Sequence, residues 1–316
     1  MFGDNVKKLR RNKKLSQEDL ATKLCVVRQT VSKWEKGLSI PDIEMLLKLA
    51  EVLDVPVNKL LIDEYATQKA EKQMKYDVII IGAGPGGIFA AYELVQCNPK
   101  LSVAIFEAGH SLDKRKCPID GEKIKTCINC KSCSIMSGFG GAGAFSDGKY
   151  NITNDFGGTL YEYIGKKQAL DLMKYVDQIN LKFGGEGTKL YTTAGTRFKT
   201  ECIQNDLHLL DASVRHLGTD INYIVLENMY AYLKDKVHFF FDTAVLSVVN
   251  ENSNYKVICK DAVYECAKCI ISVGRSGSKW MESVCKELDI STKSNRVDIG
   301  VRVELPAAVF AHLTDE

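Results

Sequence analysis

Residues 76–94 read YDVIIIGAGPGGIFAAYEL, and residues 103–109 read VAIFEAG. The apolar run over 77–81 predicts a short buried strand, and a second strand is expected over 102–106. A helix is expected directly after the first strand, because apolar residues recur at helical spacing at Ile88, Ala91 and Leu94. The order strand, G-x-G-x-x-G turn, helix, strand predicts a parallel βαβ unit that binds a dinucleotide.

Each residue type in this turn has a physical reason. Gly82 permits the tight turn, Gly84 lets the backbone approach a pyrophosphate, and Gly87 lets the helix pack closely on the strand. Free amides at the helix start attract phosphate, and Glu107 can accept a hydrogen bond from a ribose hydroxyl. The alternative is a glycine turn that only packs a βα unit. The residues expected to contact the cofactor are Gly82, Ala83, Gly84, Pro85, Gly86, Gly87, Glu107 and Ala108.

Composition indicates a soluble globular protein with room for two or more domains. The chain has 316 residues, of which 45% are apolar and 26% charged. No apolar run reaches the length of a membrane span, and the basic N-terminus lacks the apolar segment of a secretory signal. These features predict a cytoplasmic protein that does not enter a membrane. Its eleven cysteines are then expected to be thiols or metal ligands rather than structural disulfides.

Charge is distributed unevenly along the chain. Residues 1–36 hold ten basic and four acidic residues, a net +6, whereas the remainder holds 32 and 36, a net −4. A basic N-terminal part suggests contact with a polyanion. A solvated helical face is the alternative that charge alone leaves open.

Residues 1–62 predict an all-helical domain of five short helices. Ser16 is expected to cap one of them, with Asp19 three residues later. The motifs SQEDLA at 16–21, RQTVSKWEKG at 28–37 and PDI at 41–43 closely resemble the Cro and phage-repressor (xenobiotic-response-element) helix-turn-helix family. The resemblance implies that residues 28–36 form a recognition helix in the major groove of double-stranded DNA, and that the protein acts as a homodimer. It assigns DNA contacts to Gln17, Arg28, Gln29, Thr30, Ser32 and Lys33.

Two positions depart from this family's pattern. The family usually has Gly in the turn, where this chain has Cys25, which would be strained in a left-handed turn. It usually has Ser or Thr before the recognition helix, where this chain has Val27. Val27 forgoes an N-cap worth about 1 kcal/mol. The fold is expected to survive, and the DNA affinity is expected to be lower.

A polar linker is expected over 63–75, followed by a second domain over 76–316. Within it, Cys117, Cys127, Cys130 and Cys133 form a dense cluster with two adjoining C-x-x-C units. Three interpretations compete: an iron–sulfur cluster or zinc site, a redox dithiol, or a set of reduced thiols. Just before them, Arg115 lies in a basic stretch that could contact a phosphate.

A glycine-rich segment, GFGGAGAFSDGKYN at 138–151, is interpreted as a ligand-facing loop because apolar residues interleave its glycines. With GAGPGG, EAG, CPI and the C-x-x-C pairs, it makes residues 76–316 resemble the uncharacterised FAD-dependent dehydrogenases, a branch of the glutathione-reductase-like flavoproteins. The resemblance implies an α/β protein whose Rossmann-like FAD-binding domain carries an inserted, incomplete α+β substrate domain. It also implies FAD, with NAD(P)H as a candidate electron donor.

This resemblance places the adenine near Val245 and returns the chain to the cofactor at Gly274. Ser146, Asp147 and Lys149 are candidates for a position near the flavin ring. His216 and Asp220 are weighed as catalytic residues against local hydrogen bonding. No catalytic residue is assigned, and the small-molecule substrate stays open.

The resemblance also covers DIGVRVELP at 298–306, but no late G-D motif for the flavin's ribityl chain follows. The sequence is therefore expected to be truncated at the C-terminus, with weakened FAD binding. Two functions are carried forward: an FAD-dependent oxidoreductase with a sequence-specific DNA-binding domain, and a redox- or flavin-sensing transcriptional regulator without turnover. An inactive fragment is a third possibility.

Overall fold

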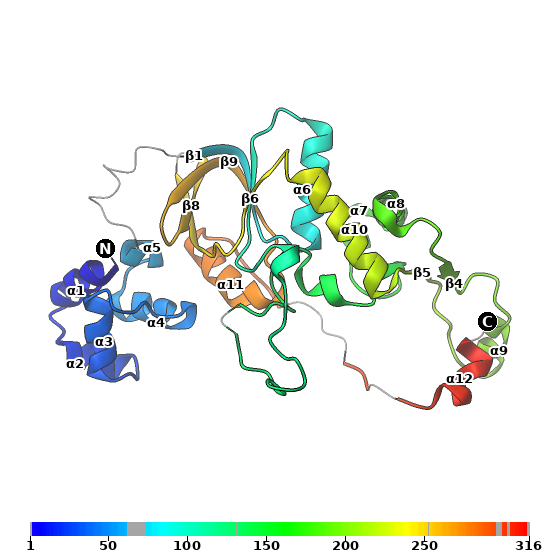
Figure 1. Ribbon diagram of the computed structural model, residues 1–316, viewed down its shortest axis with the longest axis horizontal. Coiled ribbons are helices and arrows are strands. Elements are labelled where there is room, and N and C mark those ends of the chain that lie inside the picture. The colour runs from blue at the N-terminus through cyan, green and yellow to red at the C-terminus, as the bar shows by residue number, and fades with distance from the viewer. Residues whose placement is uncertain are drawn as a thin grey trace.

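The N-terminal part of the computed structural model is a helical domain with its own apolar core. The structure describes residues 2–61, 74–130, 132–251, 253–294, 299–301 and 304–314. The five helices gather at one end of the molecule (Figure 1): α1 (Phe2–Asn12), α2 (Gln17–Lys23), α3 (Arg28–Glu35), α4 (Ile43–Leu53) and α5 (Val57–Leu61). Their fully buried side chains include Val6, Leu20, Val31, Leu49, Leu53 and Leu60. The predicted succession of short helices is confirmed.

The helix ends behave as the sequence predicts. The Ser16 hydroxyl accepts from the Asp19 amide at 3.0 Å, and the Asp19 carboxylate accepts from the Ser16 amide at 2.7 Å, which completes a capping box. Cys25 has φ +55°, the left-handed conformation predicted for that turn. Val27 precedes α3 and makes no side-chain cap, so the recognition-helix candidate begins without one.

A buried ion pair that the sequence did not suggest joins α1 to the end of α3. Arg10 donates to both oxygens of Glu35, at 2.6 and 3.1 Å, and the side chains of both residues are less than one-tenth exposed. Burial alone would raise the pKa of Glu35, but hydrogen bonds from Arg10 and Gln17, together with the Arg10 charge, lower it. The charged pair is therefore favoured in the folded state.

We expect Arg10→Leu to destabilise the helical domain by about 3 kcal/mol, because it leaves a buried carboxylate without its partner. Trp34 lies in the core of this domain and Trp280 in the second one. In a Trp280→Phe background, fluorescence during urea unfolding therefore reports on the helical domain alone. Lys13→Leu, which removes an exposed pair with Asp54, is the control and is expected to have little effect.

The pH dependence has a defined sign. Because the folded-state pKa of Glu35 is lowered, its stabilisation is present above the ordinary glutamate pKa and is lost as pH falls through the lowered value. Arg10→Leu should flatten this acid limb. An unchanged urea midpoint and an unchanged acid limb would contradict the assignment.

The second part of the chain is built on a six-stranded mixed sheet. The strand order is β6-β2-β1-β9-β8-β7. β1 pairs in parallel with β2 and β9, β2 pairs in parallel with β6, and β7, β8 and β9 form an antiparallel meander. The strands are β1 (Met74–Ile81), β2 (Val103–Phe106), β6 (His238–Phe240), β7 (Val245–Glu251), β8 (Asn254–Cys259) and β9 (Val263–Ile271).

The predicted βαβ unit is confirmed, with α6 (Pro85–Cys97) between β1 and β2. β1 begins at Met74, three residues before the expected start, because its first residues pair with β9. The two apolar faces of the sheet feed separate cores. Val78 and Ile80 pack toward α6 and α10 (Gly218–Leu233), whereas Ile79 and Ile81 pack toward α11 (Ser278–Glu287).

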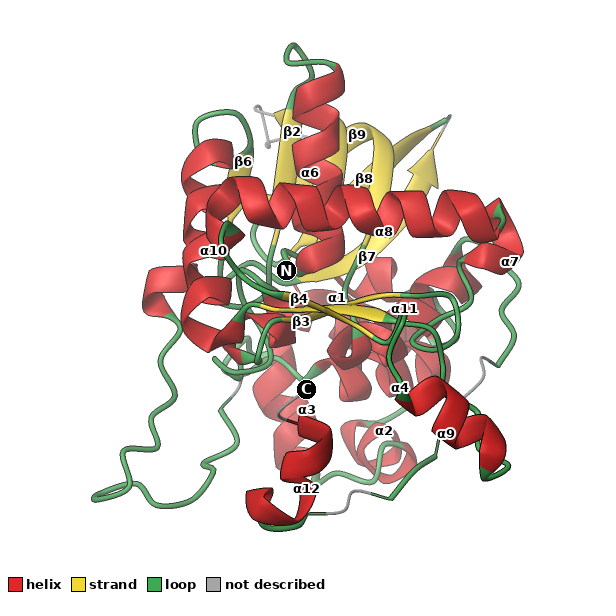
Figure 2. Ribbon diagram, turned by 90° about the vertical axis from the view of Figure 1, so that its right-hand side faces the viewer, coloured by secondary structure: helices red, strands yellow, loops and turns green. Residues whose placement is uncertain are grey.

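A smaller antiparallel sheet with its own helices lies on the other side of α6 and α10 from the large sheet (Figure 1), and below the large sheet in the view of Figure 2. Its order is β3-β5-β4, formed by β3 (Lys149–Ile152), β4 (Leu190–Thr192) and β5 (Ser213–His216). A buried ion pair, Arg215 to Asp177, fixes β5 to α8 at 2.5 and 2.8 Å. The associated segments are η3 (Gly141–Phe145), α7 (Tyr161–Ile164), α8 (Lys166–Asn180), the π-helical turn η4 (Leu181–Gly185) and α9 (Phe198–Gln204).

This three-stranded sheet with its helices agrees with the α+β part that the sequence predicts within the α/β domain. α12 (Ala307–Thr314) is the last helix among the described residues. Most of the predicted linker and part of the DIGVRVELP segment at 298–306 lie outside the described residues. The described residues of that segment, 299–301 and 304–306, form neither helix nor strand. None of the helices in the described ranges is long and apolar enough to cross a membrane.

Candidate functional site

In the glycine turn between β1 and α6, backbone segments approach one another so closely that two of the glycines have no room for a side chain. Gly82 has φ +101°, and a Cβ there would lie 2.3 Å from the carbonyl oxygen of Ser272. A Cβ on Gly87 would lie 2.0 Å from the carbonyl oxygen of Gly82. The tight-turn role of Gly82 and the packing role of Gly87 are therefore confirmed.

Gly84, by contrast, has room for a Cβ atom on the side where a side chain would project, which we call its open side. It is the N-cap of α6 with φ −73°, which any residue can adopt, and the nearest atom to an added Cβ is the Gly141 Cα at 4.0 Å. No side chain caps the helix, and Pro85 is its first residue. The first-turn amides and the helix dipole therefore make this end of α6 electropositive, which favours an anion such as a phosphate group.

Glu107 connects three backbone segments at the end of β2. It is 7% exposed, and its carboxylate accepts from the amides of Ala83 at 2.8 Å, Gly109 at 2.8 Å and Gly138 at 3.0 Å. A carboxylate has about four acceptor positions, so one remains on the oxygen that Ala83 contacts. The predicted ribose contact stays a prediction. The structure adds a positioning role that the motif did not suggest.

Arg115 is placed differently from the prediction of a phosphate contact. Its guanidinium is buried and donates to the carbonyls of Ser134, Ile135 and Phe139 at 2.6–2.8 Å. Burial lowers the pKa of Arg115, while the nearby Glu107 and Cys133 charges raise it. Arg115 therefore holds the segment that leads into the glycine-rich loop. Its guanidinium N–H groups donate to backbone carbonyls of that segment instead of to a ligand.

The glycine-rich loop lies against the glycine turn. The Gly140 amide donates to the Ala83 carbonyl at 2.8 Å, and Asn222 on α10 donates to the Gly143 carbonyl at 2.9 Å. Tyr150 donates to the Asn222 side chain at 3.2 Å, and burial raises the pKa of Tyr150. Sequence patterns did not suggest Asn222, whose partners come from distant segments.

These residues enclose a small cavity of about 160 Å³ next to the start of α6. Two of the three flavin-ring candidates line it, while Asp147 pairs with Lys149 at 3.1 Å. Neither His216 nor Asp220 lines it. The lining residues are Pro85, Gly140, Gly143, Ser146, Gly148, Lys149, Tyr150, Asn222 and Leu226.

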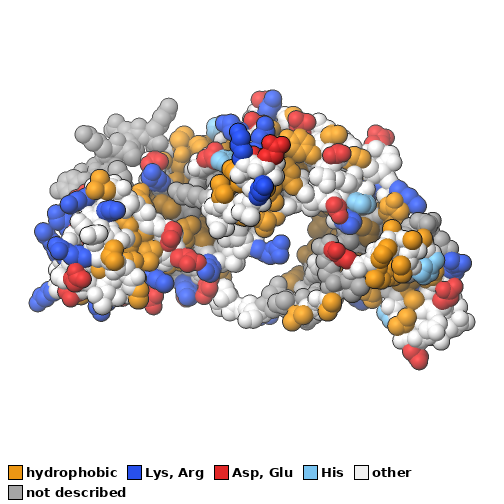
Figure 3. All heavy atoms as spheres, turned by 60° about the horizontal axis from the view of Figure 1, so that its bottom comes forward, with side chains coloured by type: hydrophobic (Ala, Val, Ile, Leu, Met, Phe, Trp, Pro, Cys, Tyr) orange, Lys and Arg blue, Asp and Glu red, His pale blue; other side chains and the backbone are white. Residues whose placement is uncertain are grey.

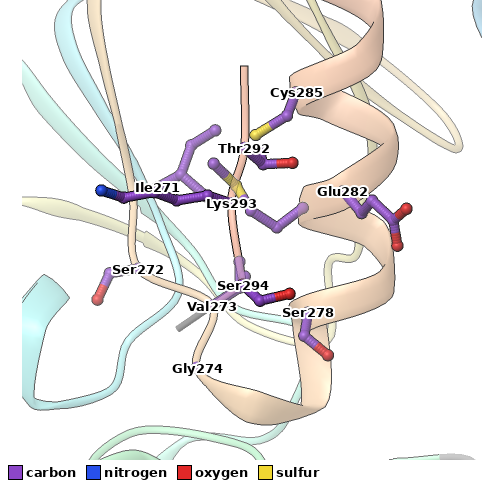
Figure 4. A pocket seen from close by; sticks show the side chains of 11 residues that line it. Ile271, Ser272, Val273, Gly274, Ser278, Glu282, Cys285, Thr292, Lys293 and Ser294 are labelled. Carbon is purple, nitrogen blue, oxygen red and sulfur yellow. The ribbon is translucent and has the colours of Figure 1, made fainter. Parts of the chain in front are cut away.

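A larger cavity of about 660 Å³ lies between the end of β9, α11 and residues 292–294 (Figure 4). Its wall includes Ser272, which also contacts the Gly82 turn, and Gly274, which has φ +63° and open space around it. Glu282 and Cys285 reach it from α11. Val245 opens β7 two residues after Thr243, whose amide donates to the Glu107 carbonyl at 2.9 Å. The chain therefore passes the Glu107 turn just before Val245.

The metal interpretation of the cysteine cluster is not supported. Within the described ranges, no three His, Cys, Asp or Glu side chains come together in a way that could hold a metal ion. Cys117 and Cys127 are exposed, and Cys130 and Cys133 are half-buried. The described parts of this segment contain neither helix nor strand, so no rigid element brings four sulfurs to one centre.

The predicted DNA-contacting side chains lie largely on the outside of α3. Arg28, Gln29 and Lys33 are exposed, and Thr30 and Ser32 are half-buried, while Val31 and Trp34 face the core. Gln17 donates to Glu35 at 2.8 Å, so its side chain is held at the start of α2. Basic side chains gather over this end of the molecule (Figure 3).

Comparison with known proteins shows which family the helical domain resembles. Residues 6–60 match the helix-turn-helix family model. The N-terminal domain is a helix-turn-helix domain. An uncharacterised HTH-type transcriptional regulator of Bacillus subtilis, YqaE, is 39% identical over 61 residues, covering 19% of this chain and 53% of its own. A structure of the biofilm regulator SinR in complex with DNA is 38% identical and covers 20% of this chain and 100% of that chain, with a TM-score of 0.19.

The second part of the chain has different relatives. Residues 59–113, which include β1, the glycine turn, α6 and β2, match the Thi4 family model. An uncharacterised protein of Clostridium beijerinckii is 22% identical over 311 residues, covering 95% of this chain and 51% of its own. Glycine oxidase from Geobacillus kaustophilus is 14% identical and covers 69% of this chain and 59% of that chain, with a TM-score of 0.41. The chain spans about half the length of the curated relatives it matches.

We expect Glu107→Gln to destabilise the second domain by about 1–3 kcal/mol, because the amide group would face a backbone donor instead of accepting from it. Hydrogen exchange at the Ala83, Gly109 and Gly138 amides should accelerate together. The control is Glu227→Gln, an exposed position on α10. Unchanged exchange at all three amides would show that Glu107 does not hold the three segments.

Proposed function

We propose that this chain is an FAD-dependent oxidoreductase of the dehydrogenase type, fused to a sequence-specific DNA-binding domain. The single observation that carries the flavin half is the turn from β1 into α6, with the buried Glu107 beside it. Support also comes from the match of this segment to the Thi4 family. NAD(P)H is the electron donor to test first, on a small-molecule substrate that the site does not identify.

The chain's own residues fit an adenine dinucleotide in a defined way. The open side of Gly84 and the first-turn amides of α6 would receive the diphosphate. Glu107 would offer its remaining acceptor position to a ribose hydroxyl, and Gly274 would border the cofactor with no side chain in the way. The flavin, when bound, supplies a reversible acceptor of hydride or electrons.

The Gly84→Ala variant tests the flavin half without disturbing the fold. An added Cβ has room and an allowed φ in this structure, but it would occupy the approach path of the diphosphate. We expect thermal stability to stay unchanged and FAD affinity to fall by about tenfold or more, equivalent to at least about 1.4 kcal/mol. Flavin absorbance retained after gel filtration, and quenching of FAD fluorescence, measure the binding.

Gly87→Ala is the matched comparison, because its Cβ would clash with the Gly82 carbonyl and should lower stability itself. Wild-type protein that cannot be loaded with FAD would overturn the flavin proposal. Equal FAD affinity in wild type and Gly84→Ala would place the diphosphate elsewhere.

For the DNA half, we propose that α3 enters the major groove of double-stranded DNA. The relative SinR has been solved in complex with DNA. Gln29 and Lys33 are exposed on α3 and are the side chains proposed to reach base edges or phosphates. Gln17, at the start of α2, would contact the DNA backbone. We expect the protein to bind two half-sites of its operator as a homodimer. We expect it to do so in the cytoplasm.

We expect Lys33→Ala to weaken binding to an operator selected from random duplexes by about tenfold and to reduce the salt slope by about 0.9 per lost phosphate contact. If Lys33 contacts a base instead, specificity relaxes at one position. Lys48→Ala, on the exposed side of α4, is the control. Binding to all duplexes with equal affinity would overturn sequence-specific recognition.

A flavin- or redox-sensing regulator without turnover is the second candidate. Lys279 on α11 contacts Glu44 on α4 at 2.5 Å, so the helix that borders the large cavity contacts the helix-turn-helix domain. Both side chains are exposed, so the pair itself stabilises little. The same operator titration, repeated with FAD oxidised and reduced, separates the candidates. A change in affinity favours the regulator, and turnover with NAD(P)H at constant affinity favours the enzyme.

A further inference from the structure

The small cavity next to the start of α6 has a buried inner wall and an exposed mouth. Its volume is about 160 Å³. Leu226 and Asn222 line the inner wall and are buried, whereas Ser146 and Lys149 line the mouth and are exposed. An engineered apolar cavity of similar volume in another protein holds one benzene molecule. The cavity therefore has room for one compact molecule about as large as a substituted benzene ring.

A hydrogen bond between Tyr150 and Asn222 lies in the cavity wall, because both residues line it. The direction of this bond is fixed by the other contacts of Asn222. Its amide nitrogen faces the carbonyl oxygens of Gly143 at 2.9 Å and Ala144 at 3.3 Å, and carbonyl oxygens can only accept. The amide oxygen therefore faces Tyr150, and the Tyr150 hydroxyl has to donate to it, at 3.2 Å.

The Tyr150 oxygen is consequently an acceptor toward the cavity. A hydroxyl has one hydrogen and further capacity to accept, and this hydrogen is used on Asn222. Burial raises the pKa of Tyr150, so the hydroxyl keeps its proton at neutral pH. A molecule that enters the cavity meets an oxygen lone pair here, and a ligand group with a hydrogen of its own satisfies it.

Ser146 presents the same kind of group at the mouth. Its hydroxyl donates to the Gly143 carbonyl at 2.8 Å, and its oxygen accepts from the Gly148 amide at 3.3 Å. One lone pair of the Ser146 oxygen remains. Tyr150 and Ser146 thus both offer acceptors, and both have already committed their hydrogens to other protein groups.

Lys149 places an ammonium group at the mouth, and its charge is balanced. Its Nζ lies 3.1 Å from a carboxylate oxygen of Asp147, and both side chains are more than half exposed. An exposed pair of this kind contributes little to stability. Because the two charges cancel, the pair gives neither an anionic nor a cationic ligand an advantage.

These contacts favour one chemical class of ligand. A carboxylate only accepts, so its oxygens would face the lone pairs of Tyr150 and Ser146 with no hydrogen between them. A hydrocarbon would leave the Tyr150 oxygen without a partner inside the cavity, which costs free energy. A neutral hydroxyl group supplies the hydrogen that these acceptors lack.

We propose that this cavity binds a small neutral alcohol. The hydroxyl of the alcohol donates to the Tyr150 oxygen, and its apolar body packs against Leu226 and the ring of Pro85, which also line the cavity. As the class of substrate, the alcohol rests on the proposed oxidoreductase function. Its binding uses side chains of the protein alone, so it can be measured without flavin.

The test measures the affinities of benzyl alcohol, toluene and benzoate for the full chain without added flavin. Benzyl alcohol is toluene with one added hydroxyl group, and benzoate carries a carboxylate on the same ring. Titrations followed by saturation-transfer NMR give each dissociation constant. We expect benzyl alcohol to bind about fivefold more tightly than toluene, the gain from one hydrogen bond, and more tightly than benzoate.

The Tyr150→Phe variant assigns this preference to one atom. It keeps the ring and removes the oxygen, so benzyl alcohol should lose its advantage while toluene keeps its affinity. The matched control is Tyr163→Phe, at a tyrosine of α7 that is 79% exposed, and all three affinities should stay unchanged. Tyr150→Phe leaves the Asn222 oxygen without its donor. If this variant does not fold, the comparison of the three compounds in the wild type still decides.

Three results would refute the alcohol site. Tighter binding of benzoate than of benzyl alcohol would show a site for anions. Equal binding of toluene and benzyl alcohol would show that the hydroxyl makes no hydrogen bond. An advantage of benzyl alcohol that survives in Tyr150→Phe would place the hydroxyl elsewhere.

FAD loading, followed by absorbance, is a separate measurement on the same protein. A chain that binds the alcohol but cannot be loaded with FAD contradicts only the flavin proposal. A chain that binds FAD but shows no preference for the alcohol contradicts only the proposal for the cavity.

Discussion

The carboxylate of Glu107 is the interaction on which the candidate cofactor site depends. It receives amides from the glycine turn, from its own strand end and from the segment that opens the glycine-rich loop. Arg115 secures the other side of that segment through three carbonyls. One buried anion and one buried cation thus hold irregular backbone in place where β1 and β2 end. Backbone amides of the loops donate to the Glu107 carboxylate, and backbone carbonyls accept from the Arg115 guanidinium. These hydrogen bonds are strong because one partner in each is charged.

Much of this arrangement could be predicted from the sequence, and the missing part has a common physical cause. The alternation of apolar runs and glycines fixed β1, the turn and α6, because local sterics decide them. The Ser16–Asp19 capping box and the left-handed Cys25 also follow from short-range rules. The basic stretch around Arg115 predicts a ligand contact, whereas its actual carbonyl partners, at 134–139, become its neighbours only after folding. Asn222 and the Arg10–Glu35 pair were missed for the same reason.

The helix-turn-helix domain shows how a departure from a family pattern can be tolerated. Val27 leaves α3 without a side-chain cap, and Cys25 occupies a conformation that favours glycine. The loss of about 1 kcal/mol at an absent cap is small beside the burial of the apolar Val31 and Trp34 side chains. Packing therefore sets this fold, and the exposed side of α3 is free to carry a different set of polar residues.

β9 has a consequence for how the chain is made. It pairs in parallel with β1 over its whole length and antiparallel with β8 over its first half, so Met74 lies opposite Tyr264. During synthesis, residues 2–61 can fold early because their contacts are local, whereas β1 has to wait for a strand that leaves the ribosome much later. Until then the apolar flank of β1 is open to wrong pairing. The nascent βαβ unit therefore carries an unpaired strand edge until β9 has been synthesised.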